Sequence, residues 1–298
     1  ERATPENEFL REEVERTVLS AVADLPEEIR TALTLREIDG LSYEEIAEVM
    51  ACPIGTVRSR IFRAREAISA RVRPMPIPAA TLVIFRHRLA GPPELLVVER
   101  SANMAFAGGA IVFPGGRIDA DDHAIAAAHA HERDEGAARV AAIRETLEES
   151  GIAIGFANAP SAEWIASAQP RLHAHEPFSS LLSEAGLDLD LDSLVPFARW
   201  CPAHREARVF DTRFYIASVS DDAPDPVVDA TENISSFWAS AQEVIDAADA
   251  GKVKVIFPTR RNLERLALFD SFAAAEAHAR NTPVDVVTPW MEERDGEP

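Results

Sequence analysis

A cluster of prolines divides the chain into two parts. Pro74, Pro76 and Pro78 fall within five positions, and a helix cannot run through them because proline lacks the backbone N–H and its ring clashes with the preceding turn. We therefore expect a stiff, extended linker here. A chain of 298 residues is long enough for two domains of ordinary size. The predicted domains are residues 1–74 and 75–298.

Charge is distributed unevenly along the chain. The whole chain carries 30 basic and 50 acidic residues, a formal net charge of −20, which argues against a general nucleic-acid binder. The sum conceals one basic island, because residues 51–74 hold 6 basic side chains and 1 acidic one. Residues 1–50 (5 basic, 14 acidic) and 75–298 (19 basic, 35 acidic) are both acidic. An anionic partner is therefore expected for residues 51–74 alone.

The remaining composition is typical of a soluble cytoplasmic protein. The chain is 47% hydrophobic and 27% charged, and its longest apolar runs, such as residues 81–85, are too short to span a bilayer. No signal peptide is recognised at the beginning of the chain. Cys52 and Cys201 lie 149 positions apart, which suits a reducing compartment better than a disulfide scaffold. We expect no membrane contact.

Residues 1–74 are expected to form a small all-α domain. Helix start and stop signals predict helices over about 8–22, 26–40, 42–50 and 54–72. Ser42 and Glu45 form a capping box at the start of the third helix. The fourth helix buries a stripe of apolar residues at helical spacing, namely Val57, Ile61, Ala64 and Ile68. A short capped helix, a tight turn and an arginine-rich helix are typical of a helix-turn-helix.

The exposed side of the fourth helix carries the candidate DNA-binding residues. Four arginines fall largely outside the buried stripe, with a serine and an aromatic residue between them: Arg58, Ser59, Arg60, Phe62, Arg63 and Arg65. Guanidinium groups suit phosphates and guanine edges because their donors form a planar fork. The cluster alone fits a solvated basic helix face equally well.

Three stretches of this domain, 25–28, 35–47 and 55–66, closely resemble region 4 of extracytoplasmic-function sigma factors. The resemblance implies that the last helix recognises the −35 element of promoter DNA and that RNA polymerase is a partner. It assigns contacts with DNA bases or phosphates to Arg58, Ser59, Phe62 and Arg63. Arg60 and Arg65 are assigned contacts with the DNA backbone. The upstream sigma region that melts the −10 element has no counterpart here, and the chain begins at Glu1. We therefore expect this domain to dock on DNA or polymerase without starting transcription alone.

Residues 75–298 are expected to form an α/β domain with a mixed sheet. Strands are predicted at 80–86, 94–99, 109–113, 194–199, 208–217 and 232–238. Helices are predicted at 137–150, 161–168, 177–185, 240–250 and 259–280.

The predicted helix at 137–150 carries three carboxylates. Glu145, Glu148 and Glu149 stand at i, i+3 and i+4, so they are expected to project from the side opposite the apolar stripe. Three like charges this close raise each other's pKa, and a hard divalent cation such as Mg²⁺ or Mn²⁺ removes that penalty. Arg144 is spaced to pair with Glu148. Without other signals, a solvated helix face is the favoured explanation of this pattern.

Two glycines upstream complete a recognisable pattern. Gly115 and Gly116 allow a backbone to approach a metal or a phosphate closely. Together with residues 144–152 (Arg-Glu-Thr-Leu-Glu-Glu-Ser-Gly-Ile), Gly116 resembles the Nudix box. Gly116 and Arg144 are 28 positions apart, twice the family's usual spacing, so an insertion lies within 117–143. The first glutamate of the box is either replaced by Asp122 or lost.

The resemblance implies the α+β Nudix fold, with a mixed sheet between helices, and hydrolysis of a diphosphate linkage. It assigns Mg²⁺ or Mn²⁺ as cofactor, held by Glu145, Glu148 and Glu149 with Gly116, and it gives Arg144 the role of orienting these carboxylates. The general base varies within this family. Glu149 and Glu232 are both candidates.

A second motif indicates the substrate class. Arg100, Gly109 and residues 113–116 keep the spacing of the coenzyme A signature of Nudix enzymes resembling the peroxisomal acyl-CoA diphosphatases. The match is partial, because the signature's second arginine falls at Ala105 and its threonine at Val98. The resemblance implies a coenzyme A, acyl-CoA or dinucleotide substrate, contacted by Arg100 and Gly115. Arg100 is a candidate for binding a terminal phosphate or the 3′-phosphate of coenzyme A.

Three functional hypotheses remain at this point. The first is a Nudix diphosphohydrolase with an attached DNA-binding module. The second is a DNA-binding transcription regulator whose Nudix domain senses a nucleotide. The third is a natural or engineered fusion whose two activities are not coupled. Retention of all three carboxylates favours an enzyme over a sensor.

Overall fold

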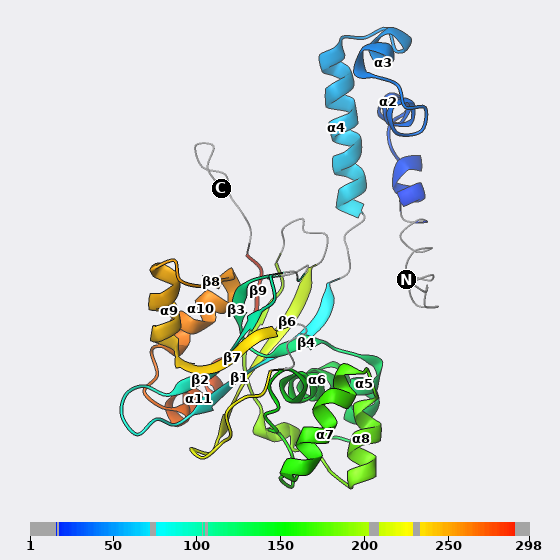
Figure 1. The fold of residues 1–298 in the computed structure, drawn as a ribbon. Coiled ribbons are helices and arrows are strands. Elements are labelled where there is room, and N and C mark those ends of the chain that lie inside the picture. Colours follow the sequence, from blue (N-terminus) through cyan, green and yellow to red (C-terminus); the bar gives the residue numbers. More distant parts are fainter. Residues whose placement is uncertain are drawn as a thin grey trace. The chain divides into compact units, whose positions relative to one another are not determined.

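The computed structural model describes residues 16, 18–71, 76–102, 104, 107–202, 209–228 and 233–289. The chain separates into two compact units, Glu1–Met75 and Pro76–Pro298, drawn as ribbons in Figure 1. Each unit has its own buried apolar clusters. None of the helices in the described part of the chain combines the length and the apolar character that crossing a bilayer requires.

The N-terminal unit consists of helices, as predicted. Its elements are α2 (Glu27–Glu37), α3 (Tyr43–Val49) and α4 (Ile54–Arg71), and residues 18–23 form a further helical turn before them. Most of the predicted first helix lies outside the described residues. The Ser42 hydroxyl accepts from the Glu45 N–H at 3.2 Å and the Glu45 carboxylate accepts from the Ser42 N–H at 2.7 Å, so the predicted capping box starts α3.

One small core holds the helix-turn-helix together. Ala32 of α2, Ile46 of α3 and Val57 and Ile61 of α4 are almost fully buried and pack against one another. The stripe of α4 continues with Ala64, which packs against Leu25 and Leu33. Because this stripe is covered by α2 and α3, the arginine-bearing side of α4 is left for other contacts.

The C-terminal unit is built on one mixed sheet. Its main path runs β8-β3-β2-β1-β6-β5-β9, while β4 pairs with β1 and β7 pairs with β2. The pairs β1–β6, β3–β8 and β5–β9 are parallel, and the other recorded pairs are antiparallel. The strands are β1 (Ile77–Arg86), β2 (Glu94–Arg100), β3 (Ala110–Val112), β4 (Gly115–Arg117), β5 (Val195–Trp200), β6 (Phe210–Val219), β7 (Asn233–Ser240), β8 (Lys254–Val255) and β9 (Val286–Val287).

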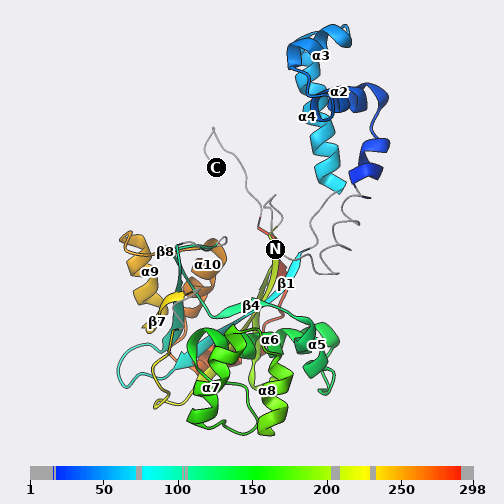
Figure 2. The ribbon, with the colours of Figure 1, turned by 45° about the vertical axis from the view of Figure 1, so that its right-hand side comes forward.

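Helices cover both faces of this sheet, so the predicted mixed sheet between helices is confirmed (Figure 2). Alternate residues of β1 enter opposite cores: Leu82 and Ile84 pack under one helical layer, and Val83 and Phe85 under the other. The first layer comprises α5 (Ala120–Ala126), α6 (Arg133–Ser150), α7 (Ala162–His173) and α8 (Phe178–Ala185). The second comprises α9 (Ala241–Asp249), α10 (Phe257–Leu266) and α11 (Phe272–Arg280). A short 3₁₀ turn, Leu191–Ser193, precedes β5.

Several predicted boundaries differ from the structure. Strand β1 begins at Ile77 and includes Pro78, so the extended linker is shorter than predicted; a proline near the start of a strand is tolerated. The predicted helix 259–280 is two helices, α10 and α11. Helix α6 begins at Arg133, where the Glu132 carboxylate accepts from two backbone N–H groups of its first turn. The short elements α5, β4, β8 and β9 were not predicted, because each is too short for its residues to show a periodic pattern.

Candidate functional site

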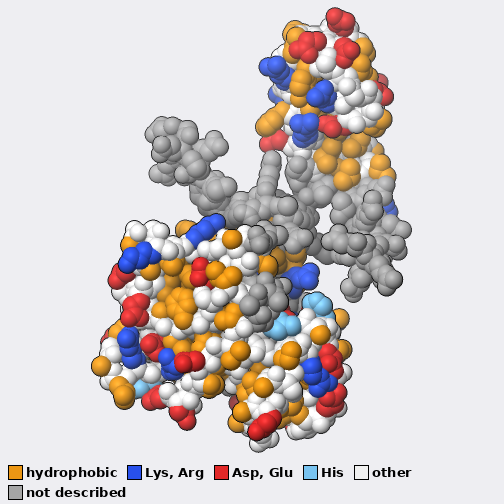
Figure 3. Space-filling view, viewed as in Figure 1, with side chains coloured by type: hydrophobic (Ala, Val, Ile, Leu, Met, Phe, Trp, Pro, Cys, Tyr) orange, Lys and Arg blue, Asp and Glu red, His pale blue; other side chains and the backbone are white. Residues whose placement is uncertain are grey.

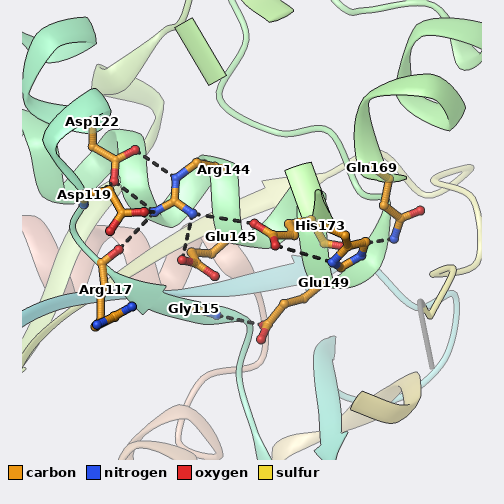
Figure 4. A network of polar contacts seen from close by, with 10 residues as sticks. Gly115, Arg117, Asp119, Asp122, Arg144, Glu145, Glu149, Gln169 and His173 are labelled. Carbon is orange, nitrogen blue, oxygen red and sulfur yellow. Dashed lines mark hydrogen bonds and ion pairs between the residues drawn. The ribbon is translucent and has the colours of Figure 1, made fainter. Parts of the chain in front are cut away.

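Arg144 lies at the centre of a buried polar network on α6 (Figure 4). Its Nε and Nη2 donate to the two carboxylate oxygens of Asp122 at 3.0 and 2.9 Å, and Nη2 also donates to the Arg117 carbonyl at 3.0 Å. Its Nη1 donates to Glu145 at 2.8 Å and lies 3.6 Å from a Glu148 oxygen. The guanidinium therefore joins the inserted helix α5 to the carboxylates of α6.

Asp122 is the ion-pair partner of Arg144. From the sequence, it was one of two alternatives for the first glutamate of the box. It is fully buried, and it also accepts a hydrogen bond from the Asp119 N–H at 2.8 Å. Burial raises the pKa of Asp122, and the hydrogen bonds and positive charge of Arg144 oppose that rise. Burial also acts to lower the pKa of Arg144, but Asp122 and Glu145 raise it overall. Asp122 and Arg144 therefore each stabilise the charged form of the other.

Two of the three predicted carboxylates have strongly raised pKa values. Burial raises the pKa of Glu145 to about 7 against the opposing charge of Arg144. Burial, followed by the negative charge of Glu145, raises the pKa of Glu149 to about 8. Glu149 is buried whereas Glu145 is partly buried, in line with the larger shift at Glu149. Without a cation, negative charge on these groups is costly.

The carboxylates of α6 lie on a largely covered part of the helix, not on a solvated face. Helix α6 is buried on almost every side, and its small residues Ala137, Ala138, Ala141 and Ala142 are fully buried. Glu145 lies against Gly116 of β4, and Glu149 accepts from the Gly115 N–H at 3.0 Å. Strand β4, which pairs with β1, therefore packs against the carboxylate-bearing side of α6.

The glycines of β4 are required by close contacts. A Cβ on Gly115 would lie 2.4 Å from the Ala80 carbonyl oxygen and 2.7 Å from the Thr81 Cα, both backbone atoms of β1. A Cβ on Gly116 would lie 2.3 Å from a carboxylate oxygen of Glu145. The first contact cannot relax without moving a strand, whereas the second relaxes if the Glu145 side chain turns away.

We therefore predict different effects for two matched alanine substitutions. Gly116→Ala displaces the Glu145 carboxylate, so we expect a chain that melts within a few degrees of the wild type but loses Mg²⁺-induced stabilisation. Gly115→Ala forces β4 away from β1, so we expect a clear loss of thermal stability. Melting curves with EDTA and with Mg²⁺ measure both effects. Equal Mg²⁺ responses in wild type and Gly116→Ala would contradict the placement of Glu145 in the site.

The donor set fits a hard divalent cation. Glu145 and Glu149 lie against the backbone of Gly116 and Gly115, Glu148 lies one turn from Glu145 on α6, and oxygen ligands are those that Mg²⁺ and Mn²⁺ prefer. Among the described residues, no three acidic, histidine or cysteine side chains already converge as a ligand set. Glu145 is instead hydrogen-bonded to Arg144, and Glu149 to Gly115. Cation binding is therefore expected to require rotation of these carboxylates.

The raised pKa values predict a pH-dependent affinity for Mg²⁺. A metal binds the ionised carboxylates, so it competes with the protons held by Glu145 (pKa about 7) and Glu149 (pKa about 8). We expect the affinity to increase from pH 6 to pH 8.5, with proton release on binding at the lower pH. Calorimetric titration of Mg²⁺ in two buffers of different ionisation enthalpy measures both quantities. If the affinity for Mg²⁺ does not change across this pH range, these groups do not bind the ion.

Helix α7 contributes two residues that the sequence did not single out. His173 Nδ1 lies 3.4 Å from a Glu148 oxygen, and the Gln169 amide donates to the backbone carbonyls of Glu148 and Val227 at 3.0 and 2.8 Å. Figure 4 shows both side chains directed toward the end of α6. Their sequence distance of more than 20 residues from Glu148 leaves no local signal by which to find them.

The predicted substrate-binding residue Arg100 is the last residue of β2. It lies across from Asn233, the first residue of β7, and its charge acts on Glu149. Arg100 and Gly115 therefore both interact with Glu149. The position of the missing second signature arginine, Ala105, and the candidate base Glu232 both lie outside the described residues.

The predicted DNA-facing residues of α4 fall into two groups. Arg58, Ser59 and Arg63 are exposed, and Phe62 is 63% exposed. Arg60 pairs with Glu28, and Arg65 with Glu37 at 2.6 Å, so both arginines are engaged by α2. Figure 3 shows basic and apolar side chains together on the surface of this unit. Of the four arginines predicted on this face, Arg58, which lies 5.8 Å from the centre of the Tyr43 ring, and Arg63 are thus exposed and form no ion pair with α2.

Comparison with known proteins supports the first module. Residues 15–68 match the family described as Sigma-70, region 4. The chain is 61% identical over 72 residues to the ECF RNA polymerase sigma-E factor of Haemophilus influenzae, which covers 24% of this chain and 38% of that protein. It is 62% identical over 72 residues to the RNA polymerase sigma-H factor of Pseudomonas aeruginosa, which covers 24% of this chain and 37% of that protein. The chain thus spans less than two fifths of the length of these relatives.

The second module resembles a solved structure. A Nudix hydrolase from Alicyclobacillus acidocaldarius superposes with a TM-score of 0.61 and 26% identity, over 68% of this chain and 96% of that one. The two predicted resemblances are therefore confirmed, each in its own part of the sequence. The chain joins a segment similar to sigma-70 region 4 to a domain with the fold of a Nudix hydrolase.

Proposed function

We propose that the C-terminal unit is a divalent-metal-dependent hydrolase of diphosphate linkages. The observation that supports this most strongly is the buried network of Arg144, which links Asp122 to the carboxylates of α6 beside the glycines of β4. A buried ion pair with this many partners is costly to keep unless it orders a site. The same segments carry the resemblance to the Nudix box, and they sit in a Nudix fold.

Each residue of the site has a separate role in this proposal. Glu145, Glu148 and Glu149, with the backbone at Gly116, would hold Mg²⁺ or Mn²⁺. The bound ion would polarise the phosphoryl oxygens and lower the pKa of a coordinated water. Arg144 is a positioning residue, because it fixes Glu145 and Glu148 from inside the protein. Arg100 and Gly115 are proposed to contact the substrate.

The proposed substrate class is a coenzyme A, acyl-CoA or dinucleotide diphosphate. A panel of acyl-CoAs, NADH, ADP-ribose and diadenosine polyphosphates, incubated with Mg²⁺, tests the proposal. We expect turnover of at least one compound into two products, each of which carries part of the cleaved diphosphate. We expect the Glu148→Gln variant to lose that turnover. No turnover of any compound, or a Glu148→Gln variant indistinguishable from wild type, would overturn it.

We also propose that residues 1–74 form a separate domain that docks on promoter DNA or RNA polymerase, and that the chain works in the cytoplasm. The exposed Arg58 and Arg63 support a DNA contact, whereas the pairing of Arg60 and Arg65 with α2 makes them structural as well. A transcription regulator whose Nudix domain senses a nucleotide remains the second candidate function, since both modules lie in one chain. Ligand binding without turnover in the panel would favour it.

A double substitution measures the DNA contact. Arg58→Ala combined with Arg63→Ala is expected to weaken binding to a duplex carrying a −35 element and, if both arginines meet phosphates, to reduce the salt slope by about 2. Gel shifts at several salt concentrations measure this. Arg30→Ala is the control, because Arg30 lies on α2 and donates to the Ala23 carbonyl. Unchanged binding by the double variant would exclude α4 as the recognition helix.

A further inference from the structure

Two neighbouring polar side chains at the edge of the candidate site carry buried polar atoms without a well-formed hydrogen bond. Asn233 is 1% exposed, and its amide forms no hydrogen bond of good geometry, although it interacts with the Glu149 carboxylate. The Nε of Arg100 is likewise buried without a partner. The two residues lie opposite each other where β2 pairs with β7, at an irregularity in the register between Glu99 and Arg100. Buried polar groups in folded proteins are nearly always bonded, so two adjacent exceptions need a reason.

Both side chains interact electrostatically with the same carboxylate, that of Glu149. Burial raises the pKa of Glu149, and the positive charge of Arg100 and the amide of Asn233 are among the groups that oppose this rise. The Gly115 N–H donates to the Glu149 carboxylate from β4. Three strands, β2, β4 and β7, therefore place polar groups around Glu149, whereas Glu145 and Glu148 are held by Arg144.

The chemistry of the unsatisfied groups defines what they bind. The Arg100 guanidinium and the Asn233 amide supply N–H donors of a kind that pairs with anionic oxygen, and the guanidinium has the planar geometry that suits a phosphoryl group. Because Glu149 is a proposed ligand of the metal, groups beside it suit the phosphate that reacts better than a phosphate at the far end of a coenzyme A.

We propose that Arg100 and Asn233 form a subsite for a nonbridging oxygen of the scissile diphosphate. This inference rests on the proposed hydrolase function and deepens it, because it moves Arg100 from a distal phosphate to the centre of the reaction and adds Asn233. These groups form good hydrogen bonds only when substrate is bound, so the fold carries their cost in its free state.

The choice between a central and a distal phosphate is tested with two substrates that differ only in the 3′-phosphate. Coenzyme A and dephospho-coenzyme A share the diphosphate, so a central subsite affects both equally. We expect Asn233→Ala, Asn233→Asp and Arg100→Ala to lower kcat/KM by about 10- to 100-fold on both. Asn233→Asp is expected to be the most damaging, because it puts a carboxylate against a phosphoryl oxygen. A loss confined to coenzyme A would overturn the inference, because Arg100 would then contact the 3′-phosphate.

Binding of a diphosphate that cannot be hydrolysed gives a readout independent of turnover. α,β-Methylene-ADP is titrated by calorimetry into the full chain, and we expect each variant to bind it about 10- to 100-fold more weakly than wild type. Equal binding by wild type and variants overturns the subsite, as does a wild type that does not bind the analogue. A wild type that binds it but hydrolyses none of the panel leaves the subsite standing and refutes the proposed hydrolase.

A matched variant separates this effect from general damage to the fold. Asn262 of α10 is also buried, at 2% exposure, and its amide nitrogen also lacks a partner, but α10 covers the other face of the sheet. Asn262→Ala is expected to leave analogue binding unchanged. Asn233→Ala is expected to melt at or above the wild-type temperature, because it removes an unsatisfied group. If Asn233→Ala unfolds, Arg100→Lys, which keeps the charge and loses the planar fork, tests the same subsite.

Discussion

Replacing Arg144 with methionine is expected to lower the free energy of unfolding by about 3–5 kcal/mol, the usual cost of removing one partner of a buried ion pair. Methionine fills much of the same volume, but it leaves the fully buried carboxylate of Asp122 with one backbone donor. It also releases Glu145 and Glu148, which Arg144 contacts from the inside. Urea denaturation followed by fluorescence measures the loss. A variant that unfolds at the wild-type urea concentration would contradict the central role of this network.

A double-mutant cycle separates the ion pair from the packing. Arg144→Met leaves the buried charge of Asp122 without its counter-ion, and Asp122→Asn removes that charge. The combined variant is therefore expected to be more stable than Arg144→Met alone. Arg171→Met is the surface control: Arg171 also forms two ion pairs, with Glu176 and Glu184, but its side chain is 33% exposed. Arg171→Met is expected to lower the free energy of unfolding only slightly, because solvent screens such exposed ion pairs. Additive effects of the two buried substitutions would show that Asp122 and Arg144 are not coupled.

Replacing Glu149 with glutamine is expected to lower activity by about 10³-fold, because it removes a metal ligand that contributes several kcal/mol to the transition state. The same variant is expected to be more stable than wild type in EDTA at pH 8.5. Glutamine keeps an oxygen that accepts from the Gly115 N–H, and it carries no charge into a buried position. A variant that keeps its turnover within tenfold of wild type would show that Glu149 does not hold the ion.

The pH dependence of stability follows from the direction of the shift. The pKa of Glu149 is raised to about 8 in the folded protein, so between its ordinary value and 8 the folded state holds more protons than the unfolded state. Metal-free stability therefore falls as pH rises through this window. We expect melting temperatures in EDTA to fall less steeply between pH 6 and 8.5 in Glu149→Gln than in wild type, whereas Glu276→Gln on α11 follows wild type. Parallel curves for all three proteins would contradict the shift.

The sequence predicted those elements whose signals are local. The capping box of Ser42 and Glu45, the stripe of α4 and the apolar run of β1 each depend on neighbours within one or two turns or pleats, and each reappears in the structure. The two glycines of β4 and the carboxylates of α6 were also found, because fixed spacing identifies them. Spacing does not reveal which sides of a helix other elements cover. Helix α6 is covered on several sides, because its alanines let neighbouring elements approach closely.

Residues that reach the site through the fold were not predicted. His173 and Gln169 meet α6 from the next helix, and Asn233 meets Glu149 through a strand that pairs with β2. A single sequence carries no signal for contacts formed between elements so far apart. Asp122 was one of two open alternatives, and only the docking of α5 on α6 shows that it faces Arg144.

The inserted segment has a consequence for any attempt to shorten this domain. Its helix α5 supplies the counter-ion of Arg144, and Asp121 of the same helix accepts a hydrogen bond from the Ser179 N–H at the start of α8. A trimmed variant that restored the family's usual spacing would thus leave a buried cation without its anion in the middle of the carboxylate helix. The extra residues are an integral part of the scaffold, and a minimal version of this domain needs a new acidic residue at that position before any of them are removed.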